Sequence, residues 1–228
     1  MAQLIEFSDL ARKHRRRVTG VLHVGAHLGE EAEIYAAQGV KNVVWVEGNP
    51  DLIEQLTENV APYGHTVIEG LVSETDGTPV EFNIANNGYS SSLLDLGTHT
   101  TAHPDVFFTE TKHLVAHRLD TLLERAGVDV SQFNYLCMDL QGAELMCLRG
   151  AARAVAAADY VYTEINEDEL YVGCARVPDL DGFLSDFQRV ETEMAEGKGW
   201  GEALYVRRGT DANSTRERWL ARIRRRPR

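Results

Sequence analysis

Short apolar runs of strand length alternate with segments of helical spacing along most of the chain. Because parallel strands are joined by right-handed crossovers that are usually helical, this alternation predicts a doubly wound sheet with helices on both faces. The predicted strands are Val21–Val24, Asn42–Glu47, His65–Leu71, Asn134–Leu140 and Asp159–Ile165. The predicted helices are Gly29–Gln38, a helix that begins at Pro50, Asp120–Ala126, Gly142–Ala157 and Pro178–Phe187.

The pattern departs from this alternation in two places. Near the C-terminus, Arg189–Met194 and Ala203–Arg207 flank the glycine-rich turn EGKGWG, which predicts an antiparallel pair. In the middle, Glu81–Ile84 and Lys112–Leu119 look extended and flank the polar segment ANNGYSSSLLDLGTHTTAHPD. The expected fold is therefore α/β, with a single Rossmann-like, doubly wound, mostly parallel sheet that ends in an antiparallel C-terminal hairpin strand.

Charge is distributed unevenly along the 228 residues, whose net charge is −12. Residues 1–17 carry +3 and residues 212–228 carry +6, so the 194 residues between them carry about −21. We expect a basic N-terminal segment (1–17), one folded domain (18–211) and an Arg-rich C-terminal tail (212–228). An acidic body lacks the basic face that a phosphate backbone requires, so we do not expect a nucleic-acid partner.

Features of membrane and secreted proteins are missing from the sequence. The longest apolar runs are too short to span a bilayer, and the N-terminus has no apolar signal-peptide core. Cys137, Cys147 and Cys174 lack metal-type spacing and are interpreted as buried free thiols. We therefore expect a cytoplasmic protein without a membrane partner, and leave a homodimer open.

Two glycines four residues apart follow the first predicted strand, in the stretch VLHVGAHLGEEAEIY. Gly25 and Gly29 allow a tight turn and a close approach of the backbone to a ligand. Glu47 ends the second predicted strand, where its carboxylate can accept hydrogen bonds from both hydroxyls of a ribose. Because ligands of such sheets lie beyond the carboxyl ends of the strands, an adenosine-containing cofactor is expected here.

Charge at the start of the next helix helps to distinguish among such cofactors. Glu30, Glu31 and Glu33 suit the helix dipole but repel a pyrophosphate, and GAHLG lacks the GxGxxG spacing of dinucleotide folds. S-adenosylmethionine carries a sulfonium cation and no phosphate, so the pattern favours a methyl donor. An NAD(P)-dependent Rossmann oxidoreductase, a non-catalytic nucleotide-binding protein and a purely structural turn remain alternatives.

Several longer stretches occur in a fixed order over Val21–Arg207: LHVGAHLGEEAEIYAAQGVKNVVWVEGNP, SSSLL, RLDTLL, MDLQGAELMCLRGA, TEINEDELYVGCA and GWGEALYVR. In them the chain resembles the FkbM family of S-adenosylmethionine-dependent methyltransferases. The combination of DLQGAE with the glycine loop and the acid of VEGNP is specific. The resemblance implies a class I methyltransferase-like fold. Many methyltransferases carry an acid two residues before the first loop glycine, whereas this chain carries His23.

The resemblance also implies cofactor-binding roles. The glycine loop would face the methionine end of the cofactor, Glu47 would bind the ribose, and nearby serines would reach the adenine or the amino-acid carboxylate. A turn-forming role is the alternative for each serine. The implied cofactor residues are His23, Gly25, Gly29, Glu47, Ser73, Ser91 and Ser92.

Acids and an amide end two predicted strands that should lie side by side. Asp139 ends one of them, and Glu164 with Asn166 ends the next. Their oxygens could hold Mg²⁺ against the vicinal oxygens of a substrate, by analogy with metal-dependent catechol-type O-methyltransferases. Asp139 is also a candidate general base, and Glu164 and Asn166 are candidate substrate contacts. Alternatively, Asp139 caps the next helix and Glu164 pairs with an arginine.

Histidines in or beside the polar middle segment are competing bases. His103 precedes a proline in a loop that could cover the site, and His113 lies in an extended segment, so both are candidate catalytic residues. A half-exposed strand face is the structural alternative for His113. Tyr89, beside the serines, is a candidate for lining the acceptor pocket.

Together these patterns predict a small methyltransferase that modifies a hydroxyl of a sugar or natural-product small molecule. The resemblance supports O-methylation more than the residues do. The acidic body favours neutral or cationic acceptors. Because the chain is too short for a separate substrate domain, residues Gly88–Lys112 and Asn166–Pro178 are expected to form the lid and the acceptor wall.

Overall fold

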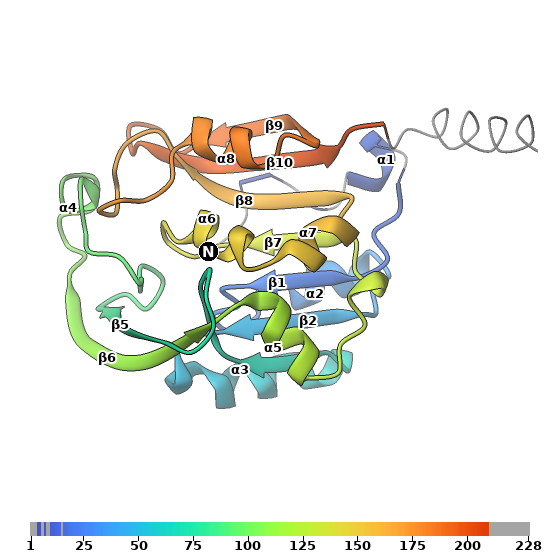
Figure 1. The fold of residues 1–228 in the computed structure, drawn as a ribbon, viewed down its shortest axis with the longest axis horizontal. Helices are drawn as coiled ribbons and strands as arrows, with labels where there is room; N and C mark the ends of the chain where they lie inside the picture. Colours follow the sequence, from blue (N-terminus) through green and yellow to red (C-terminus); the bar gives the residue numbers. More distant parts are fainter. Residues whose placement is uncertain (1–3, 6, 8–9, 15, 210–228) are drawn as a thin grey trace, which may run out of the picture.

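The computed structural model describes residues 4–5, 7, 10–14 and 16–209, and a seven-stranded sheet runs through its centre (Figure 1). The strand order is β3-β2-β1-β7-β8-β10-β9. All neighbours pair in parallel except β10, which is antiparallel to both β8 and β9. The strands are β1 (Val21–Val24), β2 (Val43–Glu47), β3 (Thr66–Glu69), β7 (Tyr135–Met138), β8 (Tyr160–Asn166), β9 (Phe187–Met194) and β10 (Trp200–Arg207). The predicted fold class, with its antiparallel C-terminal strand, is confirmed.

The central strands are buried on both faces. Every residue of β1, β2, β7 and β8 is buried, as expected of parallel strands that helices cover on both sides. Val24 pairs with Val46 on one side and with Met138 on the other, so the last residues of β1, β2 and β7 lie nearly level. The loops that follow these strands therefore meet at one edge of the sheet.

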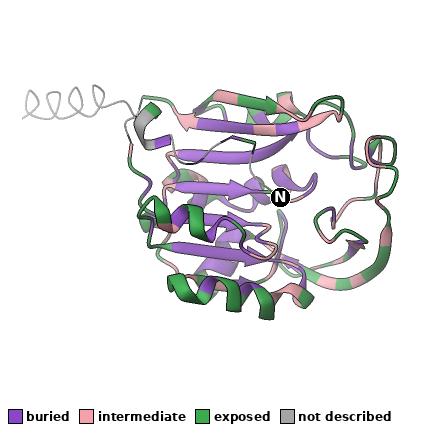
Figure 2. Cartoon of the chain, turned by 180° about the vertical axis from the view of Figure 1, so that it is seen from behind, coloured by how far each residue is buried: buried purple, intermediate pink, exposed green. Residues whose placement is uncertain are grey.

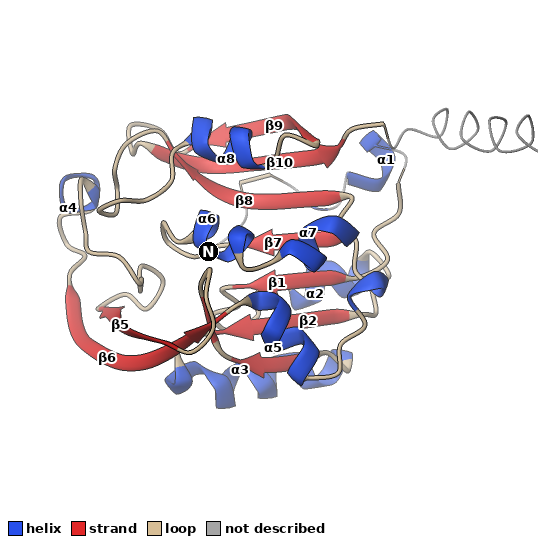
Figure 3. Ribbon diagram, in the orientation of Figure 1, coloured by secondary structure: helices blue, strands red, loops and turns tan. Residues whose placement is uncertain are grey.

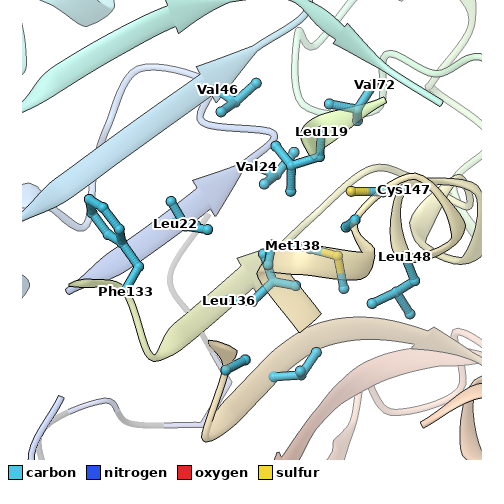
Figure 4. Close-up of a cluster of buried hydrophobic side chains, with 14 of the residues drawn as sticks. Leu22, Val24, Val46, Val72, Leu119, Phe133, Leu136, Met138, Cys147 and Leu148 are labelled. Carbon is cyan, nitrogen blue, oxygen red and sulfur yellow. The ribbon is translucent and has the colours of Figure 1, made fainter. Parts of the chain in front are cut away.

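Helices cover the two faces and create two apolar cores. One core joins the sheet to α5 (Leu119–Arg125), α6 (Glu144–Arg149), α7 (Ala152–Ala157) and α8 (Val177–Phe183). The other joins it to α1 (Leu10–His14), α2 (Ala32–Ala37) and α3 (Ile53–Val60). Figure 4 shows part of the first core, and Figure 2 shows that the covering helices expose their outer faces. Short 3₁₀ turns are η2 (Pro50–Leu52), η3 (Ala61–Tyr63) and η4 (Val130–Gln132).

The polar middle of the chain builds a second, three-stranded sheet beside the first. Its order is β4-β6-β5, from β4 (Leu71–Val72), β5 (Thr78–Ala85) and β6 (Phe108–His117). The short helix α4 (His99–Ala102) lies in the loop between β5 and β6, on the same side of the molecule (Figure 3). The prediction of extended segments on either side of the polar stretch is confirmed, whereas their pairing into a separate sheet was not predicted.

Several predicted boundaries are wrong. The third strand ends at Glu69, and the chain passes through Gly70 into β4 of the other sheet. The first helix begins at Ala32, not at Gly29. The last helix ends at Phe183, because Phe187 already pairs with Arg207 in the hairpin.

The predicted helix Gly142–Ala157 is two helices, α6 and α7, which meet at Gly150. A Cβ atom at Gly150 would overlap the backbone carbonyl oxygen of Ser73 and would lie 3.2 Å from the Cα of Arg118. The Gly150 carbonyl accepts a hydrogen bond from the N–H of Asp120 at the start of α5. Tight packing against neighbouring backbone therefore fixes the break between the helices.

The N-terminal segment is partly described by the structure, whereas the C-terminal tail is not. Phe7 and Leu10 are buried in the second core, so part of the predicted basic segment packs against the domain. Lys13 pairs with Glu191. The predicted Arg-rich tail (212–228) lies outside the described residues. No helix in the described part of the chain has the length and apolarity that a membrane span requires.

Replacing Gly150 by Ala tests the close packing at the α6–α7 junction. Since the new Cβ would displace the Ser73 backbone, we expect a loss of about 1–3 kcal/mol in the free energy of unfolding. Gly182→Ala is the matched control, because Gly182 is exposed in α8 and a Cβ there would have no atom within 4 Å. Urea unfolding should find the control as stable as wild type or up to about 1 kcal/mol more stable. Equal stabilities for both variants would contradict this packing.

Candidate functional site

A cavity opens at the carboxyl ends of β1, β2, β7 and β8, where the loops after these strands converge. The second sheet and the polar middle segment provide its opposite wall, through residues such as Phe82, Tyr89 and Leu93. In Figure 3 the parallel strands end on the side where β5, β6 and α4 lie. The cavity is therefore at the place where ligands of open α/β sheets bind.

The glycine loop forms the floor beneath one part of this cavity. Gly25 has a φ of +79°, and a Cβ atom there would overlap the backbone carbonyl of Asp139. Only glycine allows the loops after β1 and β7 to pass so closely. His27 is also left-handed, with a φ of +46°, and its N–H donates to Glu47 Oε2 over 2.8 Å. The loop therefore carries both the cavity floor and a fixed contact to Glu47.

Gly29 has a different role from the predicted one. Its φ is +74°, and a Cβ atom there would lie 2.7 Å from Val60 and 3.0 Å from Leu56 of α3. Gly29 does not line the cavity. The structure explains this glycine by close packing between the loop and α3 rather than by ligand contact.

Glu47 lines the cavity with a fixed carboxylate. Its Oε2 accepts the His27 N–H, and its Oε1 accepts the Asn49 N–H over 2.7 Å. Burial raises the pKa of Glu47, and the two backbone donors oppose that rise. A carboxylate has about four acceptor positions, so capacity for further hydrogen bonds remains on the cavity side.

His23 lies at the end of β1 as a buried, neutral ring. Burial lowers its pKa to about 4, so the imidazole is uncharged at neutral pH. It stacks on Trp45 with 4.7 Å between ring centroids, and the Tyr35 hydroxyl lies 3.0 Å from Nδ1. Since His23 also lines the cavity, it presents a neutral polar ring where many methyltransferases carry an acid.

Asp139 and Glu164 meet in the cavity through the side chain of Gln141. The Gln141 amide nitrogen donates to Asp139 Oδ1 over 2.5 Å and to Glu164 Oε2 over 2.9 Å. Burial raises the pKa of both carboxyls, and the negative charge of Asp139 raises the pKa of Glu164 further. The two acids therefore form one connected group at the end of β7 and β8.

Glu144 holds the backbone of the Asp139–Gly142 loop. It is 1 % exposed, and its Oε1 accepts the N–H of Leu140 over 2.9 Å and that of Gly142 over 3.2 Å. Burial raises its pKa to about 7. This carboxyl sets the shape of the loop and is absent from the cavity lining.

Polarity varies along the cavity. Near Glu47 the lining is apolar, and it includes Leu52, Leu71 and Phe82. This part suits a flat aromatic ring. The other end carries the carboxyl groups of Asp139 and Glu164.

Carboxyl groups are the commonest ionisable side chains of the cavity lining. No Lys or Arg among the described residues lines the cavity. A phosphate would therefore have no cationic partner there, whereas a cationic ligand would lie among carboxylates. The acidic residues that line the cavity are Glu30, Glu31, Glu47, Asp139, Glu164 and Glu202.

Sequence-predicted residues are divided between the cavity and its surroundings. Those that line the cavity are His23, Gly25, Glu47, Tyr89, Ser91, Asp139 and Glu164. Those that do not are Gly29, Ser73, Ser92, His103, His113 and Asn166.

Two of the three predicted serines have structural roles. Ser92 is 1 % exposed and its hydroxyl donates to the backbone carbonyl of Gln141 over 2.7 Å. Ser73 directly follows β4 and is buried, and its N–H donates to the carbonyl of His117. Ser91 does line the cavity, although its hydroxyl donates to the Gly88 carbonyl over 2.9 Å.

Neither predicted catalytic histidine lies in the cavity, which corrects the prediction on position. The side chain of His113 is 82 % exposed on β6, where its nearest charged partner is Glu81. His103 packs against His99 beyond α4, and burial together with Lys198 lowers its pKa. A sequence places a histidine in a loop or strand, but it does not give the direction of the side chain.

The predicted metal set is split by the structure. Asn166 lies outside the cavity, where its Nδ2 donates to Glu164 Oε1 over 3.4 Å. Its Oδ1 is buried without a hydrogen-bond partner in the described part of the chain. No three His, Cys, Asp or Glu side chains of the described residues are arranged to hold a metal ion. Asp139 and Glu164 thus share the cavity without the third predicted ligand.

Several cavity residues were not singled out from the sequence. Gln141 was part of the quoted motif DLQGAE, but its link between two acids depends on a left-handed backbone, with φ of +52°. His27 was visible only as a residue inside the glycine loop. Glu202 reaches the cavity from β10, and its carboxylate accepts from the Tyr162 hydroxyl and the Leu4 N–H. Alternation along the last strand was the available signal for Glu202.

Comparison with known families decides the class of this site. The family described as methyltransferase FkbM domain matches residues 23–199. The chain belongs to the FkbM methyltransferase family. The predicted resemblance is thereby confirmed, and membership implies S-adenosylmethionine as the methyl donor.

Individual relatives of this FkbM protein are distant. The 2-O-methyltransferase NoeI of Sinorhizobium fredii is 24% identical over 179 residues, which are 75% of this chain and 72% of NoeI. A TehB-like SAM-dependent methyltransferase from Corynebacterium glutamicum has a TM-score of 0.43 and 11% identity, over 90% of this chain and 89% of that one. The N-methyltransferase NodS of Bradyrhizobium japonicum has a TM-score of 0.47 and 8% identity, over 88% and 90%.

The neutral state of His23 can be observed directly. Because burial lowers its pKa to about 4, its ring signals in NMR should stay constant from pH 8 to pH 5.5, while a histidine in a short peptide titrates near pH 6.5. Comparison with the spectrum of His23→Gln assigns the signals. A His23 titration with a midpoint at or above pH 6.5 would contradict the burial described here.

Proposed function

We propose that this chain is an S-adenosylmethionine-dependent O-methyltransferase that acts on a hydroxyl of a sugar or natural-product small molecule. The observation that carries the proposal is the pairing of Asp139 with Glu164 in a cavity that is rich in carboxyl groups and has no described Lys or Arg in its lining. Such a cavity accommodates a sulfonium cation and provides a carboxylate to receive the hydroxyl proton.

The lining residues fit the donor along its whole length. Glu47 keeps acceptor capacity for the ribose hydroxyls, since its present partners are two backbone N–H groups. The apolar part of the cavity suits the adenine ring, with Leu52 and Phe82 in its lining. The carboxylates favour the cationic methionine end. When bound, this cofactor supplies a methyl group on a positively charged sulfur.

Asp139 is the residue that we assign as general base. Its Oδ1 accepts from Gln141, and no hydrogen bond from the described residues reaches its Oδ2. The free oxygen can accept the proton of an acceptor hydroxyl as the oxygen attacks the methyl carbon. Burial raises the pKa of Asp139, which makes its carboxylate a stronger base than an exposed aspartate.

The polar middle segment supplies the acceptor side of the cavity. Tyr89 is 42 % exposed and its ring lies 4.2 Å from that of His27, while Ser91 and Leu93 line the same wall. Tyr89 offers an aromatic face and a phenol hydroxyl to a neutral polyol, while the Ser91 hydroxyl is already bonded to the Gly88 carbonyl and the Ala85 N–H. The relative NoeI is a 2-O-methyltransferase, which supports an oxygen acceptor.

An oxidoreductase that uses NAD(P) is the weaker candidate. Its cofactor carries a pyrophosphate, and no described Lys or Arg lines the cavity to bind it. Glu30 lies at the glycine loop with its Oε1 2.7 Å from His27 Nδ1, where it would face such a phosphate. Family membership agrees with the methyl donor.

Replacing Asp139 by Asn tests the catalytic proposal. The amide cannot take a proton, so kcat for methyl transfer should fall by about 10²–10⁴-fold, while binding of S-adenosylhomocysteine stays within about threefold. Radiolabelled methyl transfer to a panel of mono- and oligosaccharides, with and without EDTA, measures the rate and any need for Mg²⁺. Glu33→Gln is the matched control, because Glu33 is exposed on α2.

Wild-type rates in Asp139→Asn would reject this residue as the base. Wild-type protein that binds the cofactor product but transfers no methyl group to any hydroxyl would reject O-methylation itself.

A further inference from the structure

Gln141 lies between the two carboxylates, and both polar atoms of its side chain have hydrogen-bond partners. Its amide nitrogen donates to Asp139 over 2.5 Å and to Glu164 over 2.9 Å. Its Oε1 accepts from the Tyr171 hydroxyl over 2.6 Å. Gln141 is 9 % exposed, so water competes little for these bonds. A neutral amide thus joins two acids from neighbouring strands to a tyrosine on a loop.

Chemistry fixes the direction of this chain of hydrogen bonds. In the base form of the site Asp139 is a carboxylate, whose oxygens accept hydrogen bonds and cannot donate them, whereas a tyrosine hydroxyl can donate. The amide nitrogen of Gln141 must therefore face the acids, and its oxygen must face Tyr171. The reversed amide would place its oxygen against both carboxylates and its nitrogen against the tyrosine hydroxyl. Each group in the chain consequently holds the next one in a single orientation.

Tyr171 is held in turn by part of the polar middle segment that lies outside the cavity lining. Its ring is fully buried, and its backbone forms a bridge with Leu96 of the polar middle segment. The Val172 N–H donates to the Asp95 carbonyl over 2.8 Å, and the Gly97 N–H donates to the Leu170 carbonyl over 2.7 Å. Residues 95–97 and 170–172 are therefore joined along their backbones. We call these two stretches the docked wall.

The loop that carries Gln141 is shaped to meet this wall. A Cβ at Gly142 would lie 3.0 Å from the Cβ atoms of both Tyr171 and Cys174. Gln141 itself has a φ of +52°, a conformation that is costly for a side chain of this size. Ser92 donates to its carbonyl and so holds the strained residue in place. In this strained backbone conformation the Gln141 amide reaches Asp139, Glu164 and Tyr171 at once.

We propose that Gln141 is a positioning residue that orients Asp139 and Glu164 for methyl transfer, and that Tyr171 ties this orientation to the docked wall. This inference rests on the proposed function. Gln141 forms no bond to the reacting atoms and acts through Asp139, so it should affect turnover and leave cofactor binding intact. Tyr171 acts through Gln141, so its effect should depend on the amide.

A double-variant cycle separates this coupling from a general structural role. Gln141→Met keeps the length of the side chain and removes the amide, and Tyr171→Phe removes only the hydroxyl. We expect kcat to fall by at least about 30-fold in Gln141→Met and by about 5- to 30-fold in Tyr171→Phe. In the Gln141→Met background, Tyr171→Phe should cause less than about a twofold further loss, because the two residues act as one unit.

Two further readouts establish that the variants are folded. Each should bind S-adenosylhomocysteine within about threefold of wild type and melt cooperatively. The matched control is Gln188→Met, since Gln188 is exposed on β9, far along the sheet from the cavity lining. Its kcat should equal that of wild type. Gln141→Asn should recover little activity, because the shorter amide cannot reach Tyr171 and both acids together.

The outcomes distinguish the inference from the function on which it rests. Two results would overturn the positioning role alone, provided that the wild type is active. One is a wild-type kcat in Gln141→Met. The other is a double variant in which the losses of kcat from the two single variants multiply. Variants that lose cofactor affinity as strongly as kcat also overturn the positioning role. A wild type that binds S-adenosylhomocysteine but transfers no methyl group overturns the proposed function and the inference together.

Discussion

The close passage of two loops at the edge of the sheet is the constraint on which the site depends. β1 and β7 pair in register through Val24 and Met138, and the loops that follow must cross within van der Waals distance. They can do so only because residue 25 is glycine, whose missing Cβ leaves room for the Asp139 carbonyl. That crossing places Asp139 beside the glycine loop, and the same loop fixes Glu47 through a backbone N–H.

Buried carboxyls are costly, and those in and beside the cavity are held by specific hydrogen-bond donors. A buried charge without partners costs several kcal/mol, so each acid needs hydrogen bonds that replace water. Glu47 and Glu144 obtain them from backbone N–H groups, whereas Asp139 and Glu164 share one side-chain amide. These hydrogen bonds offset the desolvation cost of the acids, and the carboxylates attract a cationic ligand. The same arrangement disfavours phosphates.

The sequence predicted the sheet, and it predicted the residues whose position follows from the ends of strands. Glu47 and Asp139 could be found because a strand end fixes where a side chain emerges. Asn166 and His113 lie in β8 and β6 but outside the cavity lining, because their side-chain directions depend on how the strand end and the second sheet pack. Gln141 could not be assigned a role in advance, since its link to Tyr171 joins two loops that are distant in sequence.

Calorimetric titration with S-adenosylhomocysteine tests the central claim, that the glycine loop and Glu47 form the cofactor site. Wild type should bind in the micromolar range, with no comparable binding of NAD⁺. Glu47→Ala should weaken binding at least about 10-fold, because the charged acceptor for the ribose is lost. Glu33→Ala, at an exposed acid of α2, should bind as wild type does. Absence of binding to wild type, or unchanged affinity in Glu47→Ala, would contradict the account.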